Sequence, residues 1–227
     1  MPFPACRRVR LLLAFAFAML CAAPHAEAGG LFGTHERFST DLAAFTKWDG
    51  VVARADRELR DGGPSCRVAG QICVAQWWRN FVADLAALPL RARIARANEV
   101  LNRVPYVSAI ENWHDPDHWE TPYEFIARGG QCQDYAIAKF MALAASGVPQ
   151  SALRFVVVHD NTTGADHAVT VAFVDDEALV LDNQAPAVMP ASDLRRYVPY
   201  YSINRTGWWF HQPQTPAERL QMARAAN

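Results

Sequence analysis

Apolar side chains recur at every third or fourth position through much of the chain, a spacing that gathers them on one face of an α-helix. Candidate caps precede these segments, and glycines or prolines follow them. In segment 132–146 nearly every residue is apolar or small, with Gln133, Asp134 and Lys139 as the main exceptions. This composition is typical of a helix buried on most sides. The pattern predicts helices over 38–59, 72–88, 90–107 and 132–146.

Beyond Pro149 the period shortens to two and β-branched residues become frequent, as expected of β-strands. Strands are predicted over 153–160, 167–175 and 177–183, which form an antiparallel meander. Segment 190–197 is predicted to be a short helix, and segment 198–211 an edge strand or hairpin of the same sheet. Helices followed by an antiparallel sheet indicate the α+β class.

The first residues have the pattern of a secretory signal peptide. Arg7, Arg8 and Arg10 precede the apolar run 11–23, and residues 26–28 (Ala-Glu-Ala) offer a small-residue cleavage site. The run is shorter than the roughly 20 residues that a membrane-spanning helix needs. We therefore predict cleavage after residue 28, with an uncleaved anchor as the alternative.

Residues 29–227 are predicted to form one soluble exported domain, periplasmic or secreted, with a helical part over 38–105 and a second part over 106–211. The 227 residues are 51% hydrophobic, which is enough for a sizeable core. Their formal net charge is −1, and basic and acidic residues are mixed along the chain. A nucleic-acid partner is therefore not expected.

Export also changes the role expected of the cysteines, because Cys66, Cys73 and Cys132 remain after cleavage of the signal peptide. Cys66 and Cys73 are close in sequence, and an exported protein meets an oxidising compartment, so a Cys66–Cys73 disulfide is predicted. Cys132 then has no partner. It is either a buried structural thiol or a reactive one.

Three residues favour the reactive alternative. Cys132 directly follows GGQ at a predicted helix start, where unpaired N–H groups and the helix dipole favour the nucleophilic thiolate. His167 stands near the start of one predicted strand, and Asp182 ends the next, after an apolar run. A carboxylate beside an imidazole is the orienting pair that a cysteine nucleophile needs. A histidine that merely caps its strand is the alternative for His167.

The stretch TPYEF…GGQCQDYAIAKFMAL and the segments HAVTVAF, LVLDNQ and YYSINRTGWW together resemble the bacterial transglutaminase-like cysteine peptidases, a family that includes the LapG-type periplasmic proteases. The resemblance implies a papain- and transglutaminase-like fold in which the nucleophile-bearing helix packs on an antiparallel sheet, and makes 106–211 the catalytic core. It implies Cys132 as nucleophile, His167 as general base and acid, and Asp182 as the group that orients the imidazole. The implied reaction is peptide-bond hydrolysis through a thioester.

LapG-type members cut a surface adhesin and so disperse biofilm, and some are inhibited by an inner-membrane receptor. By analogy the resemblance implies an exported or surface protein as substrate and such a receptor as regulator. The flanking acids of the LapG-type nucleophile take part in calcium binding, whereas this chain has Gln131 and Gln133 there. Asp134, Asp115 and Asp117 keep calcium possible, but we expect no cofactor because amides are poorer calcium ligands than carboxylates.

Other functions compete with hydrolysis. The same three residues could transfer the acyl group to an amine, as transglutaminases do, or the fold could be a catalytically silent binding module. A zinc site is less favoured, because His114 and His118 flank Pro116 and do not share a helix face. For the oxyanion, the backbone N–H of Cys132 is the first candidate donor, with Gln131 or Trp119 of the cleft as the second.

Overall fold

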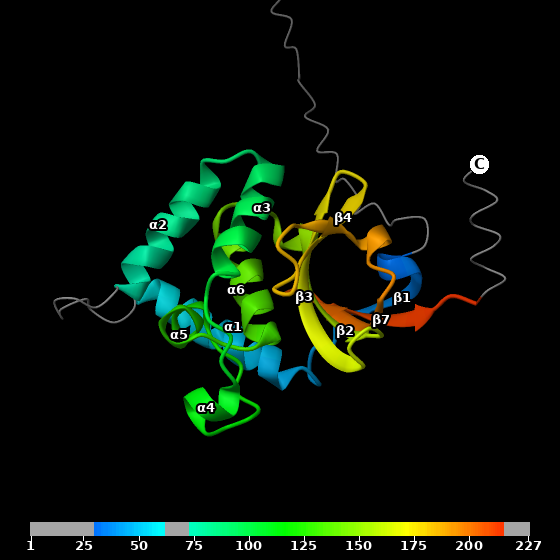
Figure 1. Cartoon of the computed structure of the whole chain (residues 1–227), viewed down its shortest axis with the longest axis horizontal. Helices are drawn as coiled ribbons and strands as arrows, with labels where there is room; N and C mark the ends of the chain where they lie inside the picture. Colours follow the sequence, from blue (N-terminus) through cyan, green and yellow to red (C-terminus); the bar gives the residue numbers. More distant parts are fainter. Residues whose placement is uncertain (1–29, 62–72, 216–227) are drawn as a thin grey trace, which may run out of the picture.

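The computed structural model describes residues 30–61 and 73–215, which form a layer of helices beside one curved β-sheet (Figure 1). The predicted α+β class is confirmed. The α-helices are α1 (Thr46–Arg60), α2 (Val74–Ala86), α3 (Leu90–Leu101), α4 (Ala109–Trp113), α5 (Pro122–Arg128) and α6 (Cys132–Ala145). The strands are β1 (Thr34–Ser39), β2 (Leu153–Asp160), β3 (Ala165–Val174), β4 (Glu177–Leu181), β5 (Met189–Pro190), β6 (Tyr197–Ile203) and β7 (Trp208–Pro213). Short 3-10 helices η1 (Leu31–Gly33), η2 (Gln150–Ala152) and η3 (Ala191–Asp193) complete these elements.

The sheet is antiparallel throughout, with strand order β1-β7-β6-β2-β3-β4-β5. Consecutive strands β2, β3 and β4 pair with one another, which confirms the predicted meander. Strands β6 and β7 form the hairpin predicted for 198–211, and β6 joins it to β2. The hairpin is not at the edge of the sheet, because β1 pairs with β7 and takes that place.

Alternate positions of the sheet serve two cores, as the side-chain period of a strand requires. On one face Phe155 and Ala172 pack against the helices. On the other face the curved sheet encloses a second cluster, to which Val156 and Val171 belong. Helix α6 packs against the first face, and the hydroxyl of Thr170 donates to the carbonyl of Ala136 at 2.5 Å. This bond fixes the start of α6 over the middle of the sheet.

The predicted helix over 38–59 is wrong in its first part. Residues 38 and 39 end strand β1, and α1 begins only at Thr46. The side chains of Ser39 and Asp41 accept backbone N–H bonds in the segment between β1 and α1, from Asp41 and Ala43 respectively. Pairing with β7 at the other end of the chain overrides the local helical pattern.

Other boundaries also differ from the prediction. The third helix ends at Leu101, because the chain turns before Pro105. Between the predicted helices 90–107 and 132–146 the structure has two further short helices, α4 and α5, and the start of α5 carries a Thr121–Glu124 capping box. Segment 190–197 forms the end of β5 and η3 rather than a regular helix.

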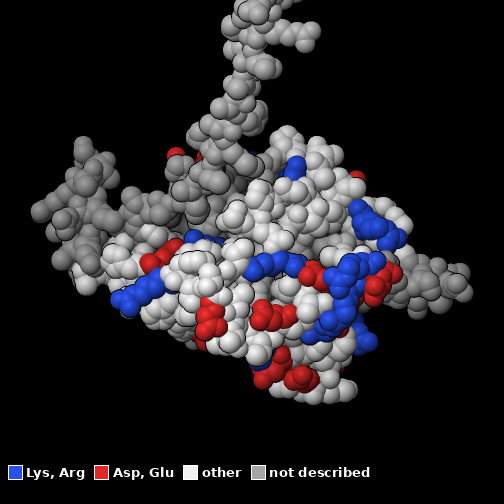
Figure 2. All heavy atoms as spheres, turned by 180° about the vertical axis from the view of Figure 1, so that it is seen from behind, with Lys and Arg blue, Asp and Glu red and all other residues white. Residues whose placement is uncertain are grey.

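Charged side chains of both signs are intermixed on the face shown in Figure 2. None of the helices in the described part of the chain is long and apolar enough to cross a bilayer. The predicted signal peptide (1–28) and Cys66 lie outside the described residues, so the cleavage and the Cys66–Cys73 disulfide stay predictions. The sulfur of Cys73 accepts the N–H of Gln76 at the start of α2.

Candidate active site

Cys132 is the first residue of α6, as the glycine pair before it indicated, and its side chain is half-buried. Gly129 has φ 82°, a left-handed conformation, and a Cβ there would lie 2.5 Å from the carbonyl oxygen of Pro105. A Cβ on Gly130 would lie 2.8 Å from the Cβ of Asp134. The two glycines therefore let the chain turn tightly into the helix that carries the thiol.

His167 and Asp182 meet at the end of the β3–β4 pair. His167 is the third residue of β3, which starts at Ala165 rather than at His167 as predicted, and Asp182 directly follows β4. Since Thr170 pairs with Leu181 in antiparallel register, the start of one strand lies beside the end of the other. Nε2 of His167 is 2.8 Å from Oδ1 of Asp182, and the two side chains are only 3% and 1% exposed.

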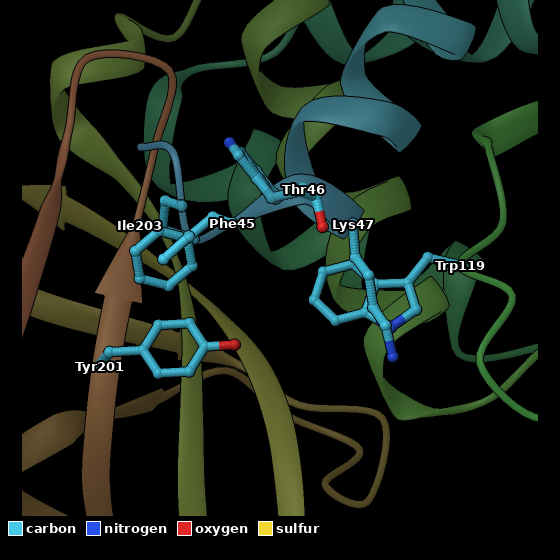
Figure 3. Close-up of a pocket in the computed structure, with 8 residues that line it drawn as sticks. Phe45, Thr46, Lys47, Trp119, Tyr201 and Ile203 are labelled. Atoms are coloured by element: carbon cyan, nitrogen blue, oxygen red, sulfur yellow. The ribbon is translucent and has the colours of Figure 1, made fainter. Parts of the chain in front are cut away.

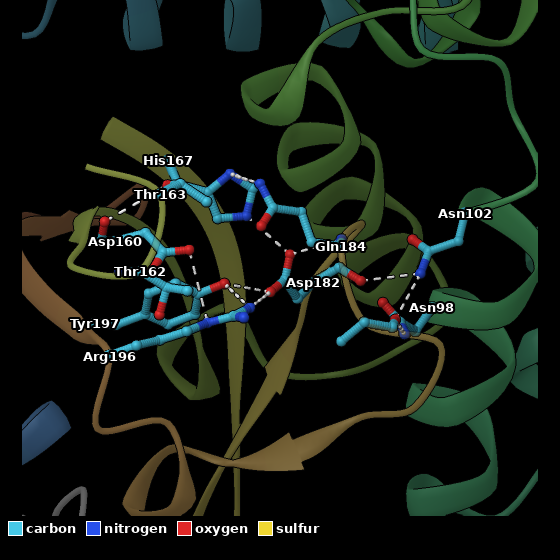
Figure 4. A network of polar contacts seen from close by, with 11 residues as sticks. Asn98, Asn102, Asp160, Thr162, Thr163, His167, Asp182, Gln184, Arg196 and Tyr197 are labelled. Carbon is cyan, nitrogen blue, oxygen red and sulfur yellow. Dashed lines mark hydrogen bonds and ion pairs between the residues drawn. The ribbon is translucent and has the colours of Figure 1, made fainter. Parts of the chain in front are cut away.

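The Asp182 carboxylate is held from several sides (Figure 4). The backbone N–H of Gln184 donates to Oδ1 at 2.9 Å. The hydroxyl of Tyr197 donates to Oδ2, and the Arg196 guanidinium lies 3.3 Å from the same oxygen. Burial alone would raise the pKa of Asp182, but the hydrogen bonds from His167, Tyr197 and Gln184 lower it below its usual range. Asp182 is therefore an ionised carboxylate at neutral pH.

The Cys132 thiol also acts on the His167 ring, because it is one of the groups that raise the pKa of His167. Nε2 of the ring is 2.8 Å from Oδ1 of Asp182, and the amide nitrogen of Gln184 lies 3.5 Å from the other ring nitrogen, Nδ1. Burial lowers the pKa of His167, but its bonds to Asp182 and Cys132 outweigh burial and raise the pKa above its usual range. The structure thus brings together the three residues that the sequence singled out, in an arrangement that stabilises an imidazolium.

The first turn of α6 is held by Asp134, which is buried. Its Oδ1 accepts the N–H of Glu120 at 2.8 Å, and its Oδ2 accepts the N–H of Gln131 at 2.8 Å and the side-chain amide of Gln133 at 3.3 Å. Burial raises the pKa of Asp134 to about 7, against the effect of the two backbone bonds. The carbonyl oxygen of the Gln133 side chain lies 3.6 Å from the Cys132 sulfur.

Gln131 and Trp119 are the two alternatives predicted for the second oxyanion donor. Oε1 of Gln131 accepts the N–H of Ala109 at 3.1 Å. The Trp119 ring packs on Phe155, with ring centroids 5.3 Å apart, and lines a cavity. Both contacts are typical of residues that shape a cleft, and a role at the oxyanion stays a prediction.

The candidate metal ligands do not come together. In the described part of the chain, no group of three or more His, Cys, Asp and Glu side chains could hold a metal ion. Asp117 pairs with Lys47 at 2.6 Å on the surface. His118 stacks on Trp113 and lies 3.2 Å from Glu124, while His114 caps α4 with φ 55°.

The residues that contact His167 and Asp182 were not identified from the sequence. Tyr197 contacts Asp182 but belongs to a segment predicted as a helix, and Gln184 contacts His167 but had no role assigned to it within the segment LVLDNQ. Lys139 was visible as a charge in an apolar helix. Its side chain is fully buried, Nζ has no hydrogen-bond partner, and burial lowers its pKa to about 7 against the attraction of Asp182.

The chain is similar to one protein family and to solved structures. A family model described as bacterial transglutaminase-like cysteine proteinase matches residues 66–215. The calcium-bound structure of LapG from Legionella pneumophila is 25% identical over 77% of this chain and 98% of that one, with a TM-score of 0.57. The EGTA-treated form is 25% identical over 74% and 87% of the two chains, with a TM-score of 0.55. No curated protein matches the chain.

Proposed function

The chain belongs to the bacterial transglutaminase-like cysteine proteinases and is a cysteine peptidase, and from this premise we propose that it hydrolyses a peptide bond of an exported protein with Cys132, His167 and Asp182. The observation that carries the proposal is the buried His167–Asp182 pair at 2.8 Å, together with the free thiol of Cys132, which helps to raise the pKa of the same ring.

Proton transfer from the thiol to Nδ1 of His167 gives a thiolate and an imidazolium. The thiolate sulfur adds to the substrate carbonyl carbon, and the imidazolium then protonates the departing amine, which leaves a thioester on Cys132. His167 next takes a proton from water, the hydroxide adds to the thioester, and the acid product leaves as the thiolate is restored. Asp182 keeps the ring oriented and stabilises its positive charge throughout.

The negative oxygen of the addition intermediate needs donors close to Cys132. A helix leaves the N–H groups of its first residues without an intrahelical acceptor, and Cys132 begins α6. We assign its backbone N–H as the first oxyanion donor, in keeping with the direction of the helix dipole.

The proposed compartment is the periplasm or the medium, and this rests on the signal-peptide pattern of residues 1–28. By resemblance to LapG-type proteases, the proposed substrate is a surface protein such as a biofilm adhesin, and an inner-membrane receptor is the proposed regulator. The mixed surface charge in Figure 2 offers no single-sign field of the kind that nucleic-acid binding uses.

The calcium of the LapG relative does not carry over to this chain on the residues present. Calcium needs several free oxygen ligands. Here Gln131 and Gln133 replace acids, and both Asp134 oxygens already accept N–H groups. Asp115 and Asp117 lie at the surface. We propose that internal hydrogen bonds hold the start of α6 and that the peptidase works without calcium.

The test compares cell-surface and released proteins from cells that produce the wild-type protein or Cys132→Ala. We expect a surface protein to be released in shortened form by the wild type alone. Purified protein incubated with that substrate and a labelled amine separates hydrolysis from acyl transfer. Amine incorporation without cleavage would favour the transglutaminase-type reaction, and release by Cys132→Ala would overturn the assignment of the nucleophile.

A further inference from the structure

A cavity of about 170 Å³ lies between the start of α1, the loop before α5 and strand β6. Tyr201 of β6 and Trp119 of the loop face it from opposite sides (Figure 3). The other residues that line it are the apolar Ala44, Phe45, Trp48 and Ile203 and the polar Thr46 and Lys47. Apolar and aromatic side chains with a few polar groups among them are common in ligand pockets.

The pairing of the strands gives the position of the cavity relative to the proposed triad. Tyr201 pairs with Val157 of β2, and Val157 pairs with Ala168 of β3, the neighbour of His167. Since adjacent strands are about 4.8 Å apart, the backbone at Tyr201 lies about 10 Å from Ala168. An extended polypeptide covers that distance in about three residues.

The loop side of the cavity is tied to the helix that carries the thiol. Trp119 directly precedes Glu120, whose N–H donates to Asp134 in the first turn of α6 at 2.8 Å. Helix α6 lies over β2 and β3, whereas the cavity lies toward β6 and Asp182 toward β4. Along the sheet, α6, the helix that carries Cys132, therefore lies between β6, which lines the cavity, and β4, which Asp182 follows.

We propose that this cavity is a specificity subsite, which takes one aromatic or branched aliphatic side chain of the substrate polypeptide within three residues of the cleaved bond. The inference rests on the proposed peptidase function. A cavity of about 150 Å³ with apolar walls accommodates benzene, so about 170 Å³ suits a side chain of that size. Aromatic walls add favourable ring contacts with such a side chain.

The positive charge of Lys47 is compatible with an apolar substrate side chain in the cavity. Lys47 lines the cavity, but its ammonium is bonded to Asp117 at 2.6 Å. The cation is thus already neutralised by a partner in the same loop as Trp119. An acidic substrate side chain would have to displace Asp117, whereas an apolar one leaves the pair intact.

The first experiment uses a mixed peptide library and mass spectrometry to identify the residues around each cleaved bond. With the wild type we expect Phe, Tyr, Leu and Met to be enriched about tenfold at one of the three positions on either side. Ala44→Trp places an indole at the lining of the cavity and should abolish this enrichment while cleavage continues. Ala43→Trp, the adjacent exposed alanine outside the lining, should keep it.

The second experiment does not depend on turnover. The rate of Cys132 alkylation is measured with an iodoacetamide that carries a phenyl group on a flexible chain of about 10 Å, and with its methyl analogue. We expect the phenyl reagent to react about tenfold faster with the wild type and with Ala43→Trp, but not with Ala44→Trp. Thermal melting of each variant reports on folding.

The outcomes separate the two proposals. Absence of cleavage together with a phenyl advantage that Ala44→Trp removes would retain the subsite and reject the peptidase function. Cleavage without any apolar preference, or with a preference that Ala44→Trp does not change, would overturn the subsite and retain the peptidase. Equal alkylation rates for both reagents in the wild type would also overturn the subsite.

Discussion

Nε2 of His167 lies 2.8 Å from Oδ1 of Asp182, and neither side chain is exposed by more than 3%. The carboxylate therefore acts on the ring with little screening by water. We predict that Asp182→Asn leaves the fold intact but lowers kcat/KM by about 10²–10⁴, because the amide no longer stabilises the imidazolium. The measurement is cleavage of the substrate found with the wild type, with circular dichroism to verify folding.

The pH profile sharpens this prediction. Asp182 raises the pKa of His167, so removal of its charge should move the alkaline limb of kcat/KM to lower pH. Asp166→Asn is the matched control, because Asp166 is an exposed carboxylate on the same strand. An unchanged alkaline limb in Asp182→Asn would reject the proposed role of Asp182.

Lys139 gives a prediction about stability. Its buried ammonium has no hydrogen-bond partner, and its pKa is lowered from 10.5 to about 7. The unfolded chain keeps the proton up to pH 10.5, so the penalty for burying the charge is full below pH 7 and is relieved as the pH rises. We predict that Lys139→Met raises the free energy of unfolding by about 1–4 kcal/mol at pH 6.

Urea denaturation at pH 6 and pH 9 measures this gain, which should be smaller at pH 9. Lys47→Met is the control, because Lys47 is exposed and its pair with Asp117 should contribute less than about 1 kcal/mol. A large loss of stability in Lys139→Met at both pH values would show that the ammonium has a stabilising partner.

The three candidate residues could be identified from the sequence, whereas parts of the fold around them could not. Cys132, His167 and Asp182 are each fixed by local features, namely a glycine turn before a helix and two neighbouring strands of one meander. Strand β1 could not be predicted in this way. Its partner β7 is more than 160 residues away in sequence, and its own pattern resembles a helix start.

The interactions of Tyr197 and Lys139 with Asp182 could not be predicted from the sequence either. The partners of Tyr197 depend on where the curved sheet brings the start of β6 relative to the end of β4, and a sequence pattern does not encode that distance. Lys139 stood out as a charge in an apolar helix, but only the packing of α6 on the sheet shows that it faces Asp182. Local periodicity therefore predicts which residues are unusual and not which of them meet.

His211 gives a second prediction about stability and pH. Its ring nitrogens lie 2.9 Å from the hydroxyls of Thr34 and Ser202, and burial lowers its pKa from 6.5 to about 4. The unfolded chain binds a proton below pH 6.5 and the folded chain does so only near pH 4, so His211 reduces stability as the pH falls through this window. The reduction should reach on the order of 3 kcal/mol.

His211→Gln isolates this contribution. Asp134 changes stability in the opposite direction over part of the same range, since its pKa is raised, so the comparison of wild type with variant is the informative quantity. We expect the wild type to be more stable than His211→Gln at pH 7 and the difference to shrink at pH 4.5. A difference that is constant with pH would contradict the prediction.

Calcium provides the last prediction, since a calcium-bound LapG is similar to this chain. We expect the melting temperature and activity of the wild type to be the same in EGTA and in 1 mM calcium (a chosen concentration, about 100 times a sensor-type Kd), because the backbone N–H groups of Glu120 and Gln131 donate to Oδ1 and Oδ2 of Asp134. The double variant Gln131→Asp, Gln133→Glu supplies two carboxylates beside Asp134 and should melt at a higher temperature in calcium than in EGTA. A ligand at 100 times its Kd adds about 2.7 kcal/mol to the free energy of unfolding. The control Gln76→Glu, Asn80→Asp adds the same charge to the exposed face of α2 and should not respond. Inactivation of the wild type by EGTA, reversed by calcium, would reject a site held by internal hydrogen bonds alone.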